Sequence, residues 1–267
     1  MKKVILLTGA TDGIGLETAK LLAADGHELL LHGRNPEKLE VTKEMIAGVP
    51  GSANVESYKA DFSDLEEVAA LAHSILETHD RIDVVINNAG VFRSPSSGLA
   101  NGLDLRFVVN AVAPFLLTRR LLPSIPDSGR IINLSSAAQD RVDLDALRGE
   151  RSLDEMSAYS QSKLALTMWS HHLAQELESE GPAVIAVNPG SFLGSKMVKE
   201  GFGMEGKDLR IGAEILYRLS TSHEFANITG KYFDNDSQRF SSPHPDALDD
   251  EKCAEVVQTL NSLIPSQ

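Results

Sequence analysis

The sequence predicts an α/β fold in which a doubly wound parallel β-sheet carries helices on both faces. Short apolar runs alternate with longer segments of helical pattern along the 267 residues, and this alternation is typical of repeated strand–helix–strand units. Runs such as residues 4–7 and 84–86 are apolar without interruption, as expected of strands buried on both faces. A glycine-rich turn at residues 9–15 joins the first run to the first helical segment.

The predicted strands and helices alternate along the chain. Strands are expected at residues 3–8, 28–32, 55–59, 84–87, 130–134, 183–188 and 231–233. Helices are expected at residues 15–24, 36–46, 65–78, 102–122, 157–180, 207–219 and 251–263. No linker-like change in composition and no repeat interrupts the pattern, so we expect a single domain over residues 1–267.

Two segments break the alternation, and each follows a predicted strand. Residues 137–156 are polar and charged, whereas residues 190–206 are rich in Gly, Ser, Met and Phe. Both could be plain surface loops. Because loops at the carboxyl ends of parallel strands line the ligand crevice of such sheets, we favour a substrate-lining role for both.

Composition excludes several classes of function. The net charge of −13 argues against nucleic acid or an anionic membrane as a partner. Cys253 is the only cysteine, so an intrachain disulfide or a cysteine-built metal site is impossible. The adjacent His171 and His172 cannot face one metal from a helix, and we expect no metal. No apolar run is long enough to span a membrane, and the first is too short for a signal peptide, so a cytoplasmic location is expected.

The glycine turn predicts a dinucleotide site. Its spacing is G-x-x-x-G-x-G, and it lies between an apolar strand and a helix. Glycines let the backbone approach a phosphate, and the helix amino terminus offers unpaired N–H groups and a positive dipole end. The expected pyrophosphate-binding residues are Gly9, Thr11, Asp12, Gly13, Ile14 and Gly15.

The ends of the next strands predict how the rest of the dinucleotide is held. Gly33 and Arg34 stand where NAD-binding folds place a carboxylate for the ribose, and a guanidinium there suits the 2′-phosphate of NADP. Asp12 adds negative charge nearby, so NAD stays possible. Asp61, followed by Phe62, could accept a hydrogen bond from adenine. The turn containing Asn88, Ala89 and Gly90 could pack against the adenosine ribose, although such turns also occur for purely structural reasons.

Tyr159 and Lys163 are the candidates for proton transfer. Four positions separate them in a predicted helix, so both side chains lie on one face. An ammonium beside a phenol favours the phenolate and should lower the pKa of Tyr159. Such a pair can move a proton on or off a carbinol oxygen.

With these motifs in order, the chain resembles the short-chain dehydrogenase/reductase family along nearly its whole length. The resemblance rests on residues 8–15, 87–90, 110, 132–136, 159–163 and 188–190. It implies a Rossmann-type sheet of about seven parallel strands. It also implies hydride transfer between NADP(H), or NAD(H), and a carbonyl or alcohol substrate.

The resemblance assigns roles to individual residues. Tyr159 would be the proton donor or acceptor, while Lys163 would lower its pKa and bind the nicotinamide ribose. Ser136 would hydrogen-bond the substrate oxygen, and Asn110 would hold a water that links Lys163 to solvent. The cofactor site would extend to Pro189, Gly190 and Ser191, with Ser195 in place of a threonine that often contacts the nicotinamide carboxamide.

Within the family, residues 102–118 and the wide separation of Ser136 from Tyr159 look like the retinol-dehydrogenase-like branch. Retinoid-handling members are usually membrane-anchored, and no anchor is evident, which argues against retinol as substrate. Apolar side chains in the second loop favour an apolar or aromatic carbonyl compound, namely those of Phe192, Leu193, Met197, Phe202 and Met204.

Two further expectations concern assembly and activity. Members of the family commonly pair through the helices holding Asn110 and Tyr159, so a homodimer or homotetramer is expected. Two alternatives to a carbonyl reductase stay open: a cofactor-binding sensor or scaffold with little or no catalysis, and a reductase of carbon–carbon double bonds.

Overall fold

The strands join into one sheet in the order β3-β2-β1-β4-β5-β6-β7-β8. Neighbouring strands are parallel except β7 and β8, which are antiparallel. The computed structural model describes residues 2–93, 102–178, 181–195, 198–199, 203 and 205–265. Its strands are β1 (Val4–Leu7), β2 (Glu28–Gly33), β3 (Val55–Lys59), β4 (Val84–Asn87), β5 (Arg130–Leu134), β6 (Ala183–Asn188), β7 (Lys231–Asp234) and β8 (Arg239–Ser241).

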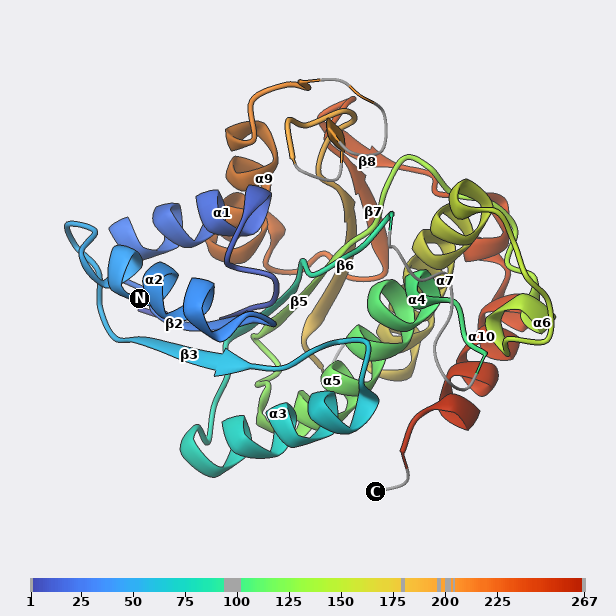
Figure 1. The fold of residues 1–267 in the computed structure, drawn as a ribbon, viewed down its shortest axis with the longest axis horizontal. Coiled ribbons are helices and arrows are strands. Elements are labelled where there is room, and N and C mark those ends of the chain that lie inside the picture. Colours follow the sequence, from blue (N-terminus) through green and yellow to red (C-terminus); the bar gives the residue numbers. More distant parts are fainter. Residues whose placement is uncertain are drawn as a thin grey trace.

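Helices cover both faces of the sheet, as predicted (Figure 1). Leu7 points to the layer of α1, α2 and α9, whereas its neighbour Leu6 points to the layer of α3, α5, α7 and α10. The helices are α1 (Gly13–Ala24), α2 (Pro36–Ala47), α3 (Leu65–Thr78), α4 (Leu105–Phe107), α5 (Ala113–Leu121), α6 (Leu144–Leu147), α7 (Glu155–Glu176), α9 (Arg210–Thr221) and α10 (Asp250–Leu263). Within the described ranges, each helix is too short or too polar to cross a bilayer.

The strand order places a ligand crevice at the carboxyl ends of β1 and β4. These two strands are neighbours, and the chain leaves them toward opposite halves of the sheet. Such a switch point leaves an open groove between the two outgoing connections. The glycine turn after β1 and the Asn88 turn after β4 both lie at this groove.

The helix predicted for residues 102–122 is interrupted at its middle. After α4, residues Val108–Val112 form a π-helical turn before α5 begins. Pro114 lies in the first turn of α5 and has no N–H to donate to the carbonyl of Asn110, four residues earlier. The π turn therefore arises where Asn110, a predicted site residue, lies.

Strand β8 was not predicted, because nothing in its sequence is typical of a buried strand. Its three residues lie at the sheet edge, paired only with β7 through a turn at residues 235–238. Gln238 adopts φ +56° in that turn. The pairing depends on the turn and on contact with β7, rather than on an apolar run.

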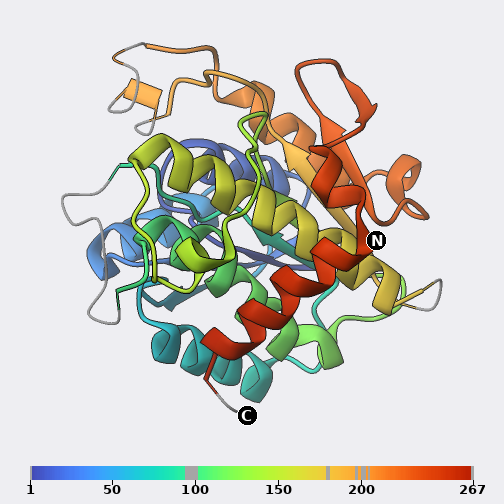
Figure 2. The same cartoon turned by 90° about the vertical axis from the view of Figure 1, so that its right-hand side faces the viewer.

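Helix α10 lies along the outer side of α7 (Figure 2). Val256 and Leu260 of α10 are buried in the same apolar cluster as Trp169 and Leu173 of α7. The Trp169 ring also packs edge-on against a neighbouring phenylalanine of α5. This face of α7 is therefore covered by the chain itself, and a partner subunit could reach it only by displacing α10.

His32 fastens the glycine turn to the ends of two strands. Its Nδ1 accepts a hydrogen bond from the backbone N–H of Gly9 at 3.3 Å, and its Nε2 lies 3.0 Å from the carbonyl oxygen of Ala60. The ring also stacks on Phe62, with 4.3 Å between ring centres. Burial lowers the pKa of His32 to about 4. The imidazole is therefore neutral, which is the form that can accept from Gly9 and donate to Ala60.

Replacing Leu260 by alanine should destabilise the protein, because Leu260 is fully buried between α10 and α7. We expect the free energy of unfolding, measured by urea denaturation, to fall by about 2–4 kcal/mol. Leu248→Ala is the matched control, since Leu248 is 53% exposed and should lose less than about 0.5 kcal/mol. Equal small losses in both variants would show that α10 does not hold α7.

His32 should make stability depend on pH. Its folded pKa of about 4 lies below the ordinary value of 6.5, so its contribution is complete above pH 6.5 and is lost as the pH falls toward 4. The loss should be about 3 kcal/mol, since each unit of pKa difference corresponds to about 1.4 kcal/mol.

The measurement is urea denaturation between pH 4 and pH 7.5. His32→Gln should show a clearly shallower decline toward low pH than the starting protein. His73→Gln, which removes an exposed histidine of α3, should keep the original slope. The idea fails if His32→Gln leaves the slope unchanged.

Candidate active site

Tyr159, Ser136 and Lys163 lie together at the carboxyl edge of the sheet. Tyr159 and Lys163 are one turn apart on α7, whose amino terminus is capped by Asp154, and Ser136 follows β5 closely. The Ser136 hydroxyl is close enough to the Tyr159 phenol to lower its pKa. The Lys163 ammonium lies 5.8 Å from the centre of the Tyr159 ring and donates to the carbonyl of Leu134 at 2.7 Å. The predicted residues are thus brought together.

The pKa of Tyr159 shifts in the direction opposite to the prediction. Burial raises it, and only the hydrogen bond from Ser136 acts downward. Lys163 does not lower it as predicted, because the ammonium is held on a backbone carbonyl and the loss of hydration dominates. Burial also lowers the pKa of Lys163 to about 8. At neutral pH the site therefore holds a neutral phenol beside a lysine that is mostly charged.

Asn110 clamps the turn that follows β4 to α7. Its Oδ1 accepts from the N–H of Val91 at 2.8 Å, and its Nδ2 donates to the Val91 carbonyl at 2.9 Å and to the Ser162 hydroxyl at 3.0 Å. Both amide hydrogens are therefore used within the protein. A water bound by Asn110, as the resemblance implies, would have to use its backbone carbonyl, which Pro114 leaves without the usual helical donor.

The glycine turn is packed without spare room. A Cβ added to Gly15 would lie 2.2 Å from the carbonyl oxygen of Gly9, so no other residue fits there. The side-chain amide of Asn88 donates to the carbonyls of Thr8 and Gly9 at 2.8 and 3.0 Å. The amide donors of Asn88 thus hold the glycine turn, while packing of the Asn88 turn against the adenosine ribose stays a prediction.

The end of β2 presents a guanidinium, with a glycine and no carboxylate before it. A Cβ on Gly33 would lie 2.6 Å from the Thr11 methyl group, so a side chain there would require Thr11 to move. Arg34 is exposed directly after it. Its charge lowers the pKa of the Asp61 carboxyl, although burial of Asp61 and its hydrogen bonds to Ser63 are the larger influences.

The side chains of Phe62 and Ser191, two predicted cofactor-binding positions, make contacts within the protein. The Phe62 ring is buried against His32, so only its backbone can contact a cofactor. The Ser191 N–H donates to the Asp236 carboxylate at 3.0 Å, and its hydroxyl does so too. Asp236 lies in the turn between β7 and β8, and no motif in the sequence pointed to it. The adjacent Gly190 has φ +124° and so needs to be glycine.

The structure describes the first irregular loop throughout and the second at residues 190–195, 198–199, 203, 205 and 206. The first contains the short helix α6, which was not predicted, and the N–H of Asp143 there donates to the Gln161 side chain at 2.9 Å. In the second loop Phe192 is 46% exposed, whereas Leu193 is buried and is not a pocket wall. Ser195 lies beside Gly13 of the glycine turn. Met197, Phe202 and Met204 lie outside the described residues.

A cavity of about 510 Å³ lies on the opposite side of α7 from Tyr159. Its lining includes Gln161, Met168 and Asp246. Gln161 is two positions beyond Tyr159 and so points to a different side of the helix. This cavity is therefore separate from the residues of the crevice.

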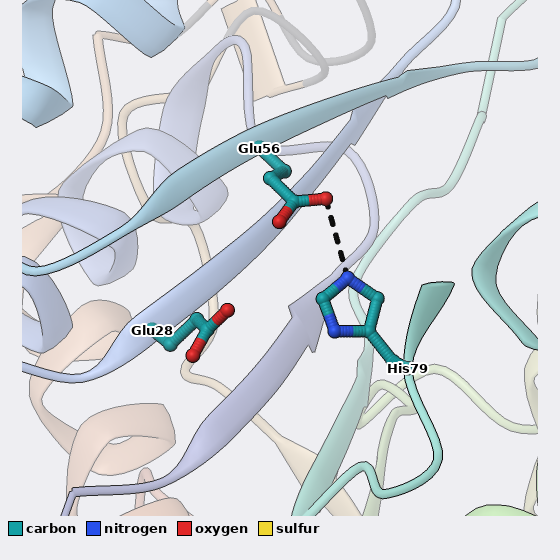
Figure 3. A group of neighbouring side chains, drawn as sticks. All are labelled: Glu28, Glu56 and His79. Carbon is teal, nitrogen blue, oxygen red and sulfur yellow. Dashed lines mark hydrogen bonds and ion pairs between the residues drawn. The ribbon is translucent and has the colours of Figure 1, made fainter. Parts of the chain in front are cut away.

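A second polar group lies at the amino ends of β2 and β3, away from the crevice. Glu28, Glu56 and His79 place possible ligand atoms within 4.8 Å of one another, and His79 points at Glu56 (Figure 3). Asn54 donates to both carboxylates at 3.0 and 2.8 Å, and Tyr58 donates to Glu56 at 2.8 Å. Because these oxygens are paired within the chain, the group is accounted for as a link between β2, β3 and α3.

Comparisons with known proteins agree with this geometry. The family model for short chain dehydrogenases matches residues 3–205. Human retinol dehydrogenase 13 is 34% identical over 93% of this chain and 80% of its own length. Human retinol dehydrogenase 11 is 38% identical over 71% of this chain and 61% of its own. An Escherichia coli structure described as a short chain dehydrogenase complexed with NADPH is 29% identical, covers 87% of this chain and 96% of its own, and has a TM-score of 0.70.

The first of these relatives aligns over most of both chains, and the family model covers the glycine turn, Asn110, Ser136, Tyr159 and Lys163. The chain therefore belongs to the short-chain dehydrogenase/reductase family, in its retinol-dehydrogenase-like branch, and is an NAD(P)-dependent oxidoreductase acting on alcohols or carbonyls.

Proposed function

We propose that this chain is an NADP(H)-dependent carbonyl reductase or alcohol dehydrogenase in which Tyr159 moves the proton. One arrangement carries the proposal: Tyr159 lies one turn before Lys163, whose ammonium is 5.8 Å from the centre of the Tyr159 ring, and Ser136 follows β5 at the same edge of the sheet that bears the glycine turn. Proton transfer of this kind needs an acid within hydrogen-bond reach of the reacting oxygen.

The residues at the end of β2 fit a dinucleotide that carries a 2′-phosphate. Gly33 offers no carboxylate to bind an unphosphorylated ribose, and so no negative charge that would repel a 2′-phosphate. Arg34 is exposed beside it, and a guanidinium suits phosphate geometry. The Escherichia coli neighbour complexed with NADPH supports the same preference.

Each residue of the site has a separate part in the transfer of the proton. When bound, the nicotinamide supplies or accepts the hydride. Ser136 holds the substrate oxygen near Tyr159, and the neutral phenol gives its proton to an oxygen that gains charge. Lys163, whose pKa is about 8, remains mostly charged at neutral pH and favours the phenolate left behind. The neutral state of Tyr159 suits the direction of carbonyl reduction.

The substrate is proposed to be an apolar carbonyl compound. Met156 lies three positions before Tyr159, on the same side of α7, and is 40% exposed. Phe192, which follows the Pro189–Gly190 turn, is 46% exposed and adopts φ +56°. A large apolar side chain held in this uncommon conformation is typical of residues that contact ligands.

Removal of the Tyr159 hydroxyl tests the function. In Tyr159→Phe, NADPH-dependent turnover of a panel of aldehydes, ketones, quinones and steroids should fall by about 10²–10⁴-fold. NADPH affinity, measured by fluorescence titration, should change by less than about twofold, because the phenol makes no charge-assisted contact to a phosphate. Tyr217→Phe removes a hydroxyl that bonds to Asp25 far from the crevice and should keep full turnover. Full turnover in Tyr159→Phe would contradict the role of Tyr159 in proton transfer.

Arg34→Ala tests the cofactor preference. A hydrogen bond between charged groups contributes about 1.5–3 kcal/mol, so NADPH affinity should fall by about 10- to 150-fold while NADH affinity stays unchanged. The control is Arg81→Ala, which removes an exposed arginine before the amino end of β4. Equal affinities of the starting protein for NADPH and NADH would rule out the proposed role of Arg34.

A further inference from the structure

The backbone carbonyl of Ser136 accepts two hydrogen bonds from residues that no motif indicated. The Tyr232 hydroxyl donates to it at 3.0 Å, and the side-chain amide of Gln139 donates to it at 3.0 Å. Tyr232 comes from β7, and Gln139 comes from the loop after β5. A carbonyl oxygen has two acceptor sites, so both are filled, and the peptide that leaves Ser136 is fixed from two directions.

The residue before Ser136 is fixed as well. The Ser135 N–H donates to the carbonyl of Val187 at 2.8 Å, and its hydroxyl lies 2.7 Å from the Thr167 hydroxyl. With the backbone held on both sides, rotation about the Cα–Cβ bond is the main freedom left to Ser136. The Ala138 N–H donates to the Ser136 hydroxyl oxygen at 3.1 Å, which leaves the Ser136 proton to point elsewhere.

The two donors are themselves held in place. Gln139 accepts from the backbone N–H of His244 at 2.9 Å through its Oε1, which orients the amide so that its NH₂ group faces Ser136. Tyr232 is buried, and burial raises the pKa of its phenol, so the hydroxyl stays protonated and can donate. Asp246, two residues after His244, pairs with Lys252 of α10. The carboxyl-terminal segment thus reaches the catalytic serine through Gln139.

We propose that Tyr232 and Gln139 are positioning residues, which hold the Ser136 backbone so that its hydroxyl meets Tyr159 and the substrate oxygen. The inference rests on the proposed function, because it gives Ser136 its task. The Ala138 N–H holds the Ser136 side-chain oxygen, so the backbone that Tyr232 and Gln139 fix decides where that hydroxyl lies relative to the phenol. Holding a catalytic group in its productive geometry contributes to rate without direct contact with substrate.

The experiment is a double-mutant cycle in which Tyr232→Phe and Gln139→Met are each made in the starting protein and in Ser136→Ala. In the starting protein each should lower kcat by about 3- to 10-fold, the range for loss of one neutral hydrogen bond, and should leave the KM for NADPH unchanged. In Ser136→Ala neither should lower kcat further, since no hydroxyl is left to position. Tyr217→Phe, with its hydroxyl on Asp25, should have no effect in either background.

A second readout separates positioning from a general loss of structure. The Ser136 hydrogen bond lowers the pKa of Tyr159, so loosening Ser136 should move the alkaline limb of the kcat–pH profile to higher pH in Tyr232→Phe. Gln139→Met provides the same tests if Tyr232→Phe is too unstable to assay. Equal fractional losses in both backgrounds, or no loss in the starting protein, would overturn the inference alone. An unmodified protein without NADPH-linked turnover would overturn the proposed function as well.

Discussion

The hydrogen bonds from Asn88 to the glycine turn are the constraint on which the crevice depends. The two strands at the switch point, β1 and β4, send the chain in opposite directions, and the turns that follow them must still meet. Asn88 donates to the carbonyls of Thr8 and Gly9, while the Thr8 hydroxyl accepts from the N–H groups of Asn88 and Ala89 at 3.0 Å. This reciprocal set satisfies polar groups that the close packing of Gly15 would otherwise leave buried and unpaired. From the other side, His32 holds the same turn.

Burial and hydrogen bonding act on the pKa of Tyr159 in opposite directions, and burial has the larger effect. A charged lysine beside a tyrosine suggests an acidic phenol when only the sequence spacing is considered. In the folded protein the ammonium donates to the Leu134 carbonyl, and the loss of water around the phenol is the larger effect. The hydrogen bond from Ser136 is the opposing influence, which makes the orientation of one serine hydroxyl important to the acidity of the site.

Much of the fold could be predicted because its strands are buried on both faces and therefore appear as continuous apolar runs. The bounds of β3, β4, β5 and β6 agree with the predicted ranges. Strand β8 could not be predicted, because its three residues have no apolar pattern and depend on their partner. The π turn at Asn110 has a visible cause in Pro114, but helical periodicity alone does not reveal its effect on the hydrogen-bond pattern.

The site was predictable as a set of positions but not as a set of side-chain directions. Motif order identifies Asn110, Ser136, Tyr159 and Lys163, and the fold brings them to one edge. Partners that lie far away in the sequence then decide where each neighbouring group points. Asp236, in the β7–β8 turn, accepts a hydrogen bond from the N–H of Ser191. The Phe62 ring stacks on His32. Gln139 and Tyr232 carry no recognisable signal, because their role depends on a backbone carbonyl that any residue would supply.

The covering of α7 by α10 also has a consequence for biosynthesis. Helix α7 is complete at Glu176, whereas α10 begins only at Asp250. At ribosomal speeds of about 5–20 residues per second, the apolar face around Trp169 stays uncovered for several seconds while the intervening chain is made. During this interval the nascent protein exposes an apolar surface that chaperones can recognise. The helix that bears Tyr159 is thus among the last parts of the molecule to be covered.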